Sequence, residues 1–85
     1  ELGSNYPNPF NPSTTIGFNI VHGSEVTLSV YDINGRLIST VYNAYTMPGI
    51  YKAMWNGQGK ASGIYFYELS AKPYFKKTGK MTLIK

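Results

Sequence analysis

The 85-residue chain contains no cysteine, so a disulfide framework, a cysteine-ligated zinc site and a thiol nucleophile are all excluded. No run approaches the roughly 20 consecutive apolar residues that a membrane-spanning helix needs, so we expect no membrane insertion by the chain itself. Residue 1 is Glu rather than Met, and no signal peptide is recognisable. We therefore expect a module from a longer protein, with any export signal upstream.

Residues suited to catalysis are also scarce. The four acidic residues are scattered singly, so neither a paired-carboxylate site nor a triad around His22, the only histidine, is expected. The turn DING at residues 32–35 lacks the remaining acidic ligands of a calcium loop. The glycine-rich GQGKASG at residues 57–63 lacks the strand-to-helix context of a phosphate-binding loop. We expect no enzyme, no metal site and no cofactor.

Aromatic residues are plentiful, with eight Tyr, four Phe and one Trp. In GIYFYELS, Tyr65, Tyr67 and Leu69 share one face, which favours a core position over a platform that stacks nucleic acid bases. Six segments show this period of two, with turn residues between them. The pattern predicts an all-β fold, an antiparallel immunoglobulin-like β-sandwich of about six to seven short strands. The segments are residues 14–20, 25–31, 36–42, 49–55, 63–70 and 77–85.

The first of these segments is preceded by NYPNPFNPSTT, in which Pro7, Pro9 and Pro12 fix φ at about −65°. Proline also lacks the amide that a central strand donates, so the stretch is neither a helix nor a central strand. We expect a stiff, polyproline-like strap that Tyr6 and Phe10 pin to the sandwich. Its expected role is structural, as a rigid N-terminal seam, and direct reading by a partner is the alternative.

Positive charge is concentrated toward the C-terminal end of a chain whose net charge is +4. Residues 60–85 contain six of the eight basic residues and one of the four acidic residues. Two interpretations stay open. Lysines on an edge strand keep that edge from pairing with another sheet, and they also form a docking surface for an acidic partner.

Four motifs follow one another along the chain: NYPNPFNPSTTI, VTLSVYDINGRLI, SGIYFYEL and TGKMTLIK. Together they closely resemble the C-terminal sorting domains of the type IX secretion system, type A, of Bacteroidetes and related bacteria. The likeness covers residues 5–85 as a single domain, and residues 1–4 are expected to be a remnant of the linker from an upstream cargo domain. The immunoglobulin-like part of the flagellar hook-capping protein is the nearest look-alike.

The resemblance implies a secretion signal that directs a cargo protein from the periplasm through the outer-membrane translocon to the cell surface or the medium. The implied partners are the translocon with its shuttle and sortase components, and the cargo domain in the same chain. A sortase-like peptidase would remove the domain and, in some cargos, attach the cargo to the surface. The alternatives are an accessory immunoglobulin-like module that binds carbohydrate or protein, and an assembly module similar to the hook-capping protein.

The positions of the family's motifs, carried over one by one, fall into two groups. The positions implied in translocon recognition are Lys80, Met81, Leu83 and Lys85. The positions expected to be mainly structural are Asn5, Pro7, Asn8, Pro9, Phe10, Asn11, Pro12, Asp32, Gly35, Gly63 and Tyr65. One departure concerns the loop after Trp55, which is short and carries Lys60 in place of an acidic stretch, so no role of that loop is transferred.

Overall fold

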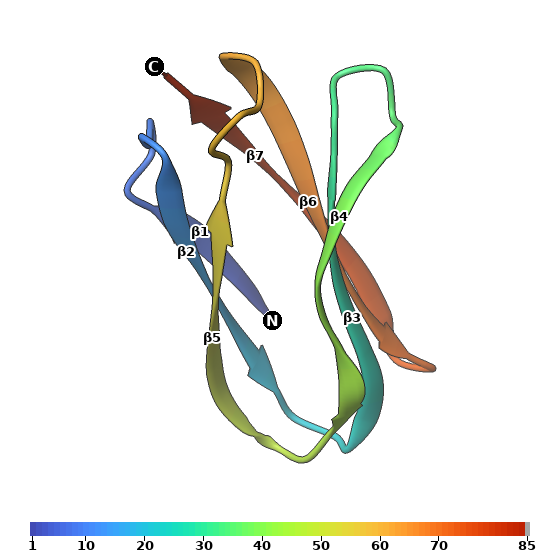
Figure 1. The fold of residues 1–85 in the computed structure, drawn as a ribbon. Helices are drawn as coiled ribbons and strands as arrows, with labels where there is room; N and C mark the ends of the chain where they lie inside the picture. Colours follow the sequence, from blue (N-terminus) through green and yellow to red (C-terminus); the bar gives the residue numbers. More distant parts are fainter. Residues whose placement is uncertain (85) are drawn as a thin grey trace.

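The computed structural model describes residues 1–84, which form seven β-strands and no helix (Figure 1). The strands run between the two ends of an elongated molecule whose longest dimension is 37 Å. Their bounds are β1 Leu2–Tyr6, β2 Ser13–Ile20, β3 Ser24–Tyr31, β4 Leu37–Thr46, β5 Gly49–Asn56, β6 Gly63–Lys72 and β7 Phe75–Leu83.

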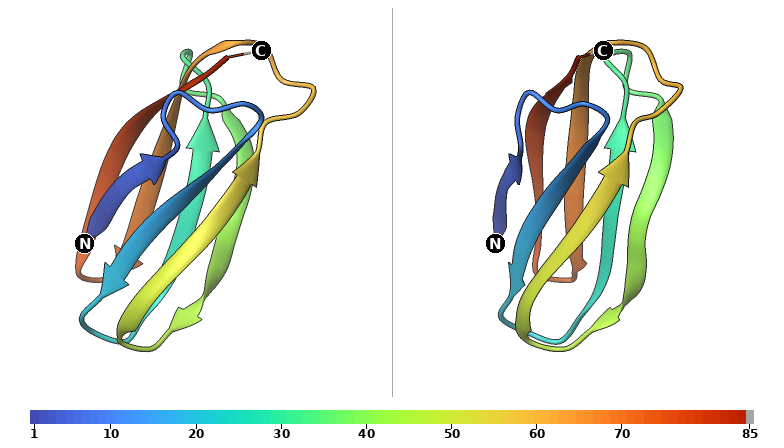
Figure 2. Two further views of the ribbon diagram at one scale, coloured as in Figure 1. Left: turned by 90° about the vertical axis from the view of Figure 1, so that its left-hand side faces the viewer. Right: turned by 60° about the vertical axis from the view of Figure 1, so that its left-hand side comes forward.

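The seven strands form two antiparallel sheets that pack face to face (Figure 2). One sheet has three strands in the order β1-β2-β5, and the other has four in the order β4-β3-β6-β7. This arrangement confirms the predicted antiparallel β-sandwich, and each of the six predicted segments overlaps one strand. The seventh strand is β1, which includes Leu2, Gly3 and Ser4 of the expected linker remnant.

The core lies between the sheets, where the alternating side chains meet. In β2, Ile16, Phe18 and Ile20 are buried, and the residues between them are half-buried. Successive side chains of a strand point to opposite faces, so a period of two in the sequence places one full set inside. The buried apolar residues are Phe10, Ile16, Phe18, Ile20, Val26, Leu28, Val30, Trp55, Tyr65, Tyr67, Leu69, Ala71, Met81 and Leu83.

The Asn-Pro segment, residues 7–12, joins β1 to β2 across one end of the sandwich (Figure 2). It bends at residues 7–9 and again at 11–12 instead of running as a straight, polyproline-like strap. Phe10 anchors it, with 1% of its surface exposed. The prediction that Tyr6 also pins the segment is wrong, because Tyr6 is 80% exposed. Tyr6 pairs with Thr15, whose side chain faces outward from the sheet.

Two seams remain where the edge strands of the stacked sheets lie beside each other. We call them the β1–β7 seam and the β4–β5 seam, after the strands that approach there. β4 continues into β5 through a corner at residues 47–48. At the opposite end of the sandwich lie the Asn-Pro segment, the β3–β4 turn, the β5–β6 loop and the C-terminal end of β7 (Figure 1). The motifs singled out in the sequence therefore gather largely at one end of the molecule.

Candidate recognition site

Strand β7 carries three exposed lysines along the edge of the four-stranded sheet. Lys76 lies opposite Ser70, and Lys80 lies opposite Phe66, so both face outward from the sandwich. Lys77 alternates with them and lines a cavity of about 370 Å³ with His22. Within residues 1–84 the one ion pair joins two other residues, so the lysines of β7 form none in this part of the chain. Their charge is open to solvent and to a partner.

The four positions implied in translocon recognition have different surroundings. Lys80 is exposed, whereas Met81 and Leu83 are 0% and 1% exposed and belong to the core. Lys85 lies outside the described residues. Because a core side chain cannot contact a partner while the domain stays folded, Met81 and Leu83 hold β7 in place and Lys80 presents the surface.

The end of β7 is paired with the Asn-Pro segment. The Phe10 amide donates to the Thr82 carbonyl over 3.0 Å, and the Ile84 amide donates to the Phe10 carbonyl over 3.0 Å, which makes a parallel bridge between Phe10 and Leu83. The Thr82 amide donates to Asn8 Oδ1 over 3.1 Å. Two motifs at opposite ends of the sequence are thus hydrogen-bonded into one structural unit.

A buried network gives the Asn-Pro segment its shape. Asn5, 4% exposed, donates through Nδ2 to Thr14 Oγ1 over 3.0 Å and to the Pro7 carbonyl over 3.2 Å. The Thr14 hydroxyl donates to the same Pro7 carbonyl over 2.9 Å. These bonds fix the turn that leaves β1. The other polar residues of the segment, Asn8 and Asn11, are exposed.

Tyr67 joins the two sheets across the β1–β7 seam. Its hydroxyl accepts a hydrogen bond from the Asn5 amide and donates to the Gly3 carbonyl, both over 3.2 Å, where the register of β1 shifts. Its ring covers Gly79 so closely that a Cβ at Gly79 would lie 2.3 Å from Tyr67 Cζ. Burial raises the pKa of the Tyr67 hydroxyl.

The contact of Tyr67 with Gly79 was not predicted, although one signal for it is present in the sequence. Gly79 stands alone within the lysine-rich last strand, and glycine in a strand interior is typical of a close approach by another group. Tyr67 is its direct partner in the β6–β7 register. The sequence alone does not show that β6 pairs with β7 in this register, so it could not connect Tyr67 with Gly79.

The β3–β4 turn has a well-defined structural role. The Asp32 carboxylate accepts hydrogen bonds from the amides of Arg36, over 2.9 Å, and Asn34, over 3.0 Å. It also forms an ion pair with Arg36 Nε at 3.2 Å. The hydrogen bond from the Arg36 amide is the main cause that lowers the pKa of the Asp32 carboxyl. Gly35 has φ +83°, a left-handed conformation that glycine adopts without strain.

The remaining motif positions lie around the loop that leads into β6. Gly63 opens the strand, and the buried Tyr65 donates its hydroxyl hydrogen to the Ala61 carbonyl over 2.7 Å. The Gly57 amide in the same loop donates to the Pro12 carbonyl over 2.8 Å, which ties the loop to the Asn-Pro segment. A cavity of about 360 Å³ lies between them, lined by Asn11, Pro12, Gly57, Gln58, Gly59 and Leu83.

No three His, Asp or Glu side chains in residues 1–84 are grouped so that they could hold a metal ion. The same residues contain no helix that is long and apolar enough to cross a membrane.

Comparison with known proteins gives one finding. A family model described as the secretion system C-terminal sorting domain matches residues 4–85, which is nearly the whole chain. No curated protein and no solved structure matches. Sorting domains of this type are signals for the type IX secretion machinery, they are non-catalytic in general, and they imply secretion to the cell surface or the extracellular space.

Proposed function

Since the chain belongs to the family of type IX secretion system C-terminal sorting domains, we propose that it carries a cargo domain of the same polypeptide through the outer-membrane translocon. The cargo reaches the periplasm first and then the medium or the cell surface. The domain itself acts as an address that is recognised, and the chemistry belongs to other proteins.

The observation that carries this proposal is the exposed, unpaired charge of β7. Lys76, Lys77 and Lys80 lie on one edge strand, and no acidic group within residues 1–84 forms an ion pair with them. A cluster of one sign attracts a surface of the opposite sign and speeds encounter with it. The proposed docking partner is therefore a carboxylate-rich surface of the translocon or its shuttle, with Lys80 at the centre of the contact.

The signal needs the folded domain. Met81 and Leu83 lie in the core on the same strand as the exposed lysines, so unfolding would remove the spacing and direction of those lysines. The Asn-Pro segment supports this arrangement through its hydrogen bonds to Thr82 and Ile84. Its proposed role is thus structural, as a lock on the end of β7.

Removal of the domain after export is part of the same proposal. A sortase-like peptidase would cut the chain and attach some cargos to the surface. Because Leu2 to Tyr6 pair with β2, an extended substrate would be accessible before β1 rather than inside it. We therefore propose a cut upstream of Leu2.

A fusion tests the proposed function. Residues 1–85 would follow a fluorescent reporter with an inner-membrane signal peptide, in a bacterium that has a working type IX system. We expect the reporter on the surface or in the medium, and in the periplasm when the translocon is deleted. A reporter that stays in the periplasm of both strains, with the domain folded, would contradict the proposal and favour an accessory binding module.

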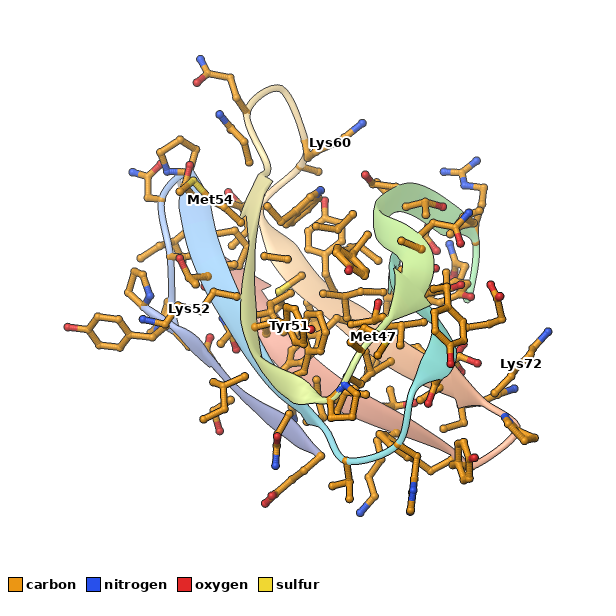
Figure 3. The ribbon with its side chains drawn as sticks, turned by 90° about the horizontal axis from the view of Figure 1, so that it is seen from below. Met47, Tyr51, Lys52, Met54, Lys60 and Lys72 are labelled. Carbon is orange, nitrogen blue, oxygen red and sulfur yellow. The ribbon has the colours of Figure 1, made fainter. Side chains whose placement is uncertain are left out.

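A pair of charge variants tests the proposed contact. Lys80→Glu reverses a charge on β7, and Lys52→Glu reverses an exposed charge on β5 of the other sheet (Figure 3). We expect Lys80→Glu to reduce export strongly and Lys52→Glu to leave it near the level of the unchanged fusion, with equal thermal stability. Equal export by both variants would remove Lys80 from the contact.

A further inference from the structure

Strand β4 forms the edge of the four-stranded sheet opposite to β7, and it contains no charged residue. The uncharged stretch extends over residues 37–51, through the corner and into β5. Proteins commonly protect edge strands with lysines, bulges or covering segments, because an open edge can pair with another strand. β7 carries three exposed lysines, which have this effect whatever else they bind, whereas β4 carries none.

Part of β4 is also regular enough to pair. The register with β3 shifts at residues 38 and 41, and such bulges disturb an edge. Residues 42–46 pair with β3 without interruption, and β3 is their one neighbour in the sheet. The Thr46 hydroxyl donates to the Ala44 carbonyl over 3.0 Å, but a carbonyl accepts two hydrogen bonds. This regular half of β4 thus keeps backbone groups available on its outer side.

Large apolar side chains are exposed close to the regular half of β4. Tyr45 lies on it, and Met47 follows at the corner between β4 and β5, where Figure 3 shows it. Ile50, just beyond the corner, is 84% exposed. Single exposed apolar residues are ordinary, but their association with an unprotected edge favours a surface that another chain covers.

The distribution of charge points to the occupant of this edge. The lysines at positions 72, 76, 77 and 80 all lie on β6 and β7, on the far side of β3 from β4. Two copies of a chain with net charge +4 repel each other least when these lysine-rich strands lie farthest apart. Contact through β4 gives that arrangement, with both β7 strands at the outer ends of one continuous sheet.

We propose that β4 pairs antiparallel with β4 of a second copy of this chain, around Ala44. In this register Tyr42 lies opposite Thr46 of the second copy, and Asn43 lies opposite Tyr45. Tyr42 and Thr46 both face the core side. They pair with the buried positions Leu28 and Ser24 of β3, and the Tyr42 ring also packs against Phe18. Inward side chains therefore meet inward side chains, as a continuous sheet requires. The pairing does not depend on the sorting role.

Sedimentation velocity of the 85-residue chain over rising concentration tests this pairing. We expect the mass to rise from 9.5 kDa toward twice that value. Ala44→Lys places two lysines face to face at the two-fold axis, and like charges opposite each other weaken strand pairing. We expect this variant to raise the dissociation constant about tenfold or more, with unfolding by heat unchanged at a dilution where both proteins are monomeric.

Ser62→Lys is the matched control, since it adds the same charge at an exposed position in the β5–β6 loop. It should associate as the unchanged chain does. If Ala44→Lys fails to fold, Asn43→Lys at the neighbouring exposed position replaces it. A chain that stays monomeric at every concentration would overturn the proposal. A dimer that none of the β4 variants weakens, or that Ile50→Lys weakens instead, would overturn it as well.

Discussion

The β1–β7 seam and the β4–β5 seam close the same sandwich in different ways. At the β1–β7 seam, the backbone of Phe10 is hydrogen-bonded to the end of β7, and the Tyr67 hydroxyl bonds to the backbone of β1. At the β4–β5 seam, the strands converge toward the corner at residues 47–48 (Figure 1), and half-buried side chains such as Val41 and Tyr51 pack against the core. The β1–β7 seam is held by several hydrogen bonds, and the β4–β5 seam mainly by apolar packing, with one hydrogen bond from the Tyr51 hydroxyl to the Met47 carbonyl over 2.7 Å at its corner.

Because of this difference, the seam with more hydrogen bonds is the one that lies beside the proposed recognition surface. The lysines of β7 lie at the seam where hydrogen bonds reach the backbone of both edge strands, whereas the uncharged edge of β4 lies at the seam whose hydrogen bond is confined to the corner, from the Tyr51 hydroxyl to the Met47 carbonyl. Directional bonds fix where a charge points, whereas apolar packing leaves an edge that can accept a further strand. The bonds at the β1–β7 seam join residues far apart in the sequence, so changes at either end of the chain should weaken the same unit.

Phe10→Ala should have the largest effect. Phe10 is buried and packs edge-on against Trp55, with ring centroids 5.8 Å apart. Removal of a buried Phe side chain costs about 3–5 kcal/mol in the free energy of unfolding, because a cavity replaces it. Tyr6→Ala, at the exposed aromatic residue at the end of β1 just before this segment, should cost about 0.5 kcal/mol or less. Urea unfolding of both variants measures the difference, and equal losses would contradict the anchoring role of Phe10.

Gly79→Ala should come next. The added Cβ would meet the Tyr67 ring at 2.3 Å, so ring or strand must move, at a cost of about 1–3 kcal/mol. Gly17→Ala is the matched control on β2, because its Cβ would lie 3.8 Å from the nearest atom, the Tyr51 carbonyl oxygen. We expect that variant to keep its stability. If Gly79→Ala unfolds at the same urea concentration as Gly17→Ala, the seam is looser than described.

Tyr67→Phe should lower the free energy of unfolding by about 1–2 kcal/mol, since it leaves the Asn5 amide and the Gly3 carbonyl without their partner. The raised pKa of Tyr67 adds a pH signature. A raised pKa in the fold gives stability that is present below the unfolded value of about 10 and lost as the pH rises through the folded value. The advantage of the unchanged chain over Tyr67→Phe should therefore shrink above pH 10. A constant advantage up to pH 11.5 or so would argue against the burial of this hydroxyl.

Asp32→Asn, in the turn that leads into β4, should have the smallest effect. The lowered pKa of Asp32 means that its contribution is present above the unfolded pKa of about 3.9 and is lost as the pH falls through the folded value. The unchanged chain should therefore lose slightly more stability than Asp32→Asn between neutral pH and strongly acidic pH. Thermal unfolding across that range measures this, and parallel curves would show that the turn carboxylate does not stabilise the fold.

Much of the fold could be predicted because it depends on local alternation. The inward positions of β6, such as Tyr65, Tyr67 and Leu69, follow from a period of two, and the DING turn follows from its own residues. Tyr6 and Phe10 could not be distinguished in this way. Both are aromatic residues beside prolines, and the pairing of Tyr6 with Thr15 is what turns Tyr6 outward.

The hydrogen bonds between the Asn-Pro segment and the end of β7, which we call the interlock, could not be predicted for a related reason. The bonds from Phe10 to Thr82 and Ile84 join opposite ends of the chain, and no local pattern encodes which strand the Asn-Pro segment meets. Basic charge near the C-terminus was visible in the sequence, but the burial of Met81 and Leu83 between the lysines required the sheet register. The sequence therefore pointed to this segment as a whole, and the structure separates its exposed residues from its core residues.

Hydrogen exchange of individual amides, followed by NMR, tests the interlock most directly. We expect the amides of Phe10, Thr82 and Ile84 to be protected to nearly the same degree as that of Met81 in the interior of β7, since all are hydrogen-bonded in one unit. Asn8→Ala should release the Thr82 amide first. Exchange of Phe10 and Ile84 at the rate of exposed loop amides, with Met81 still protected, would contradict the claim that the two ends of the chain are joined.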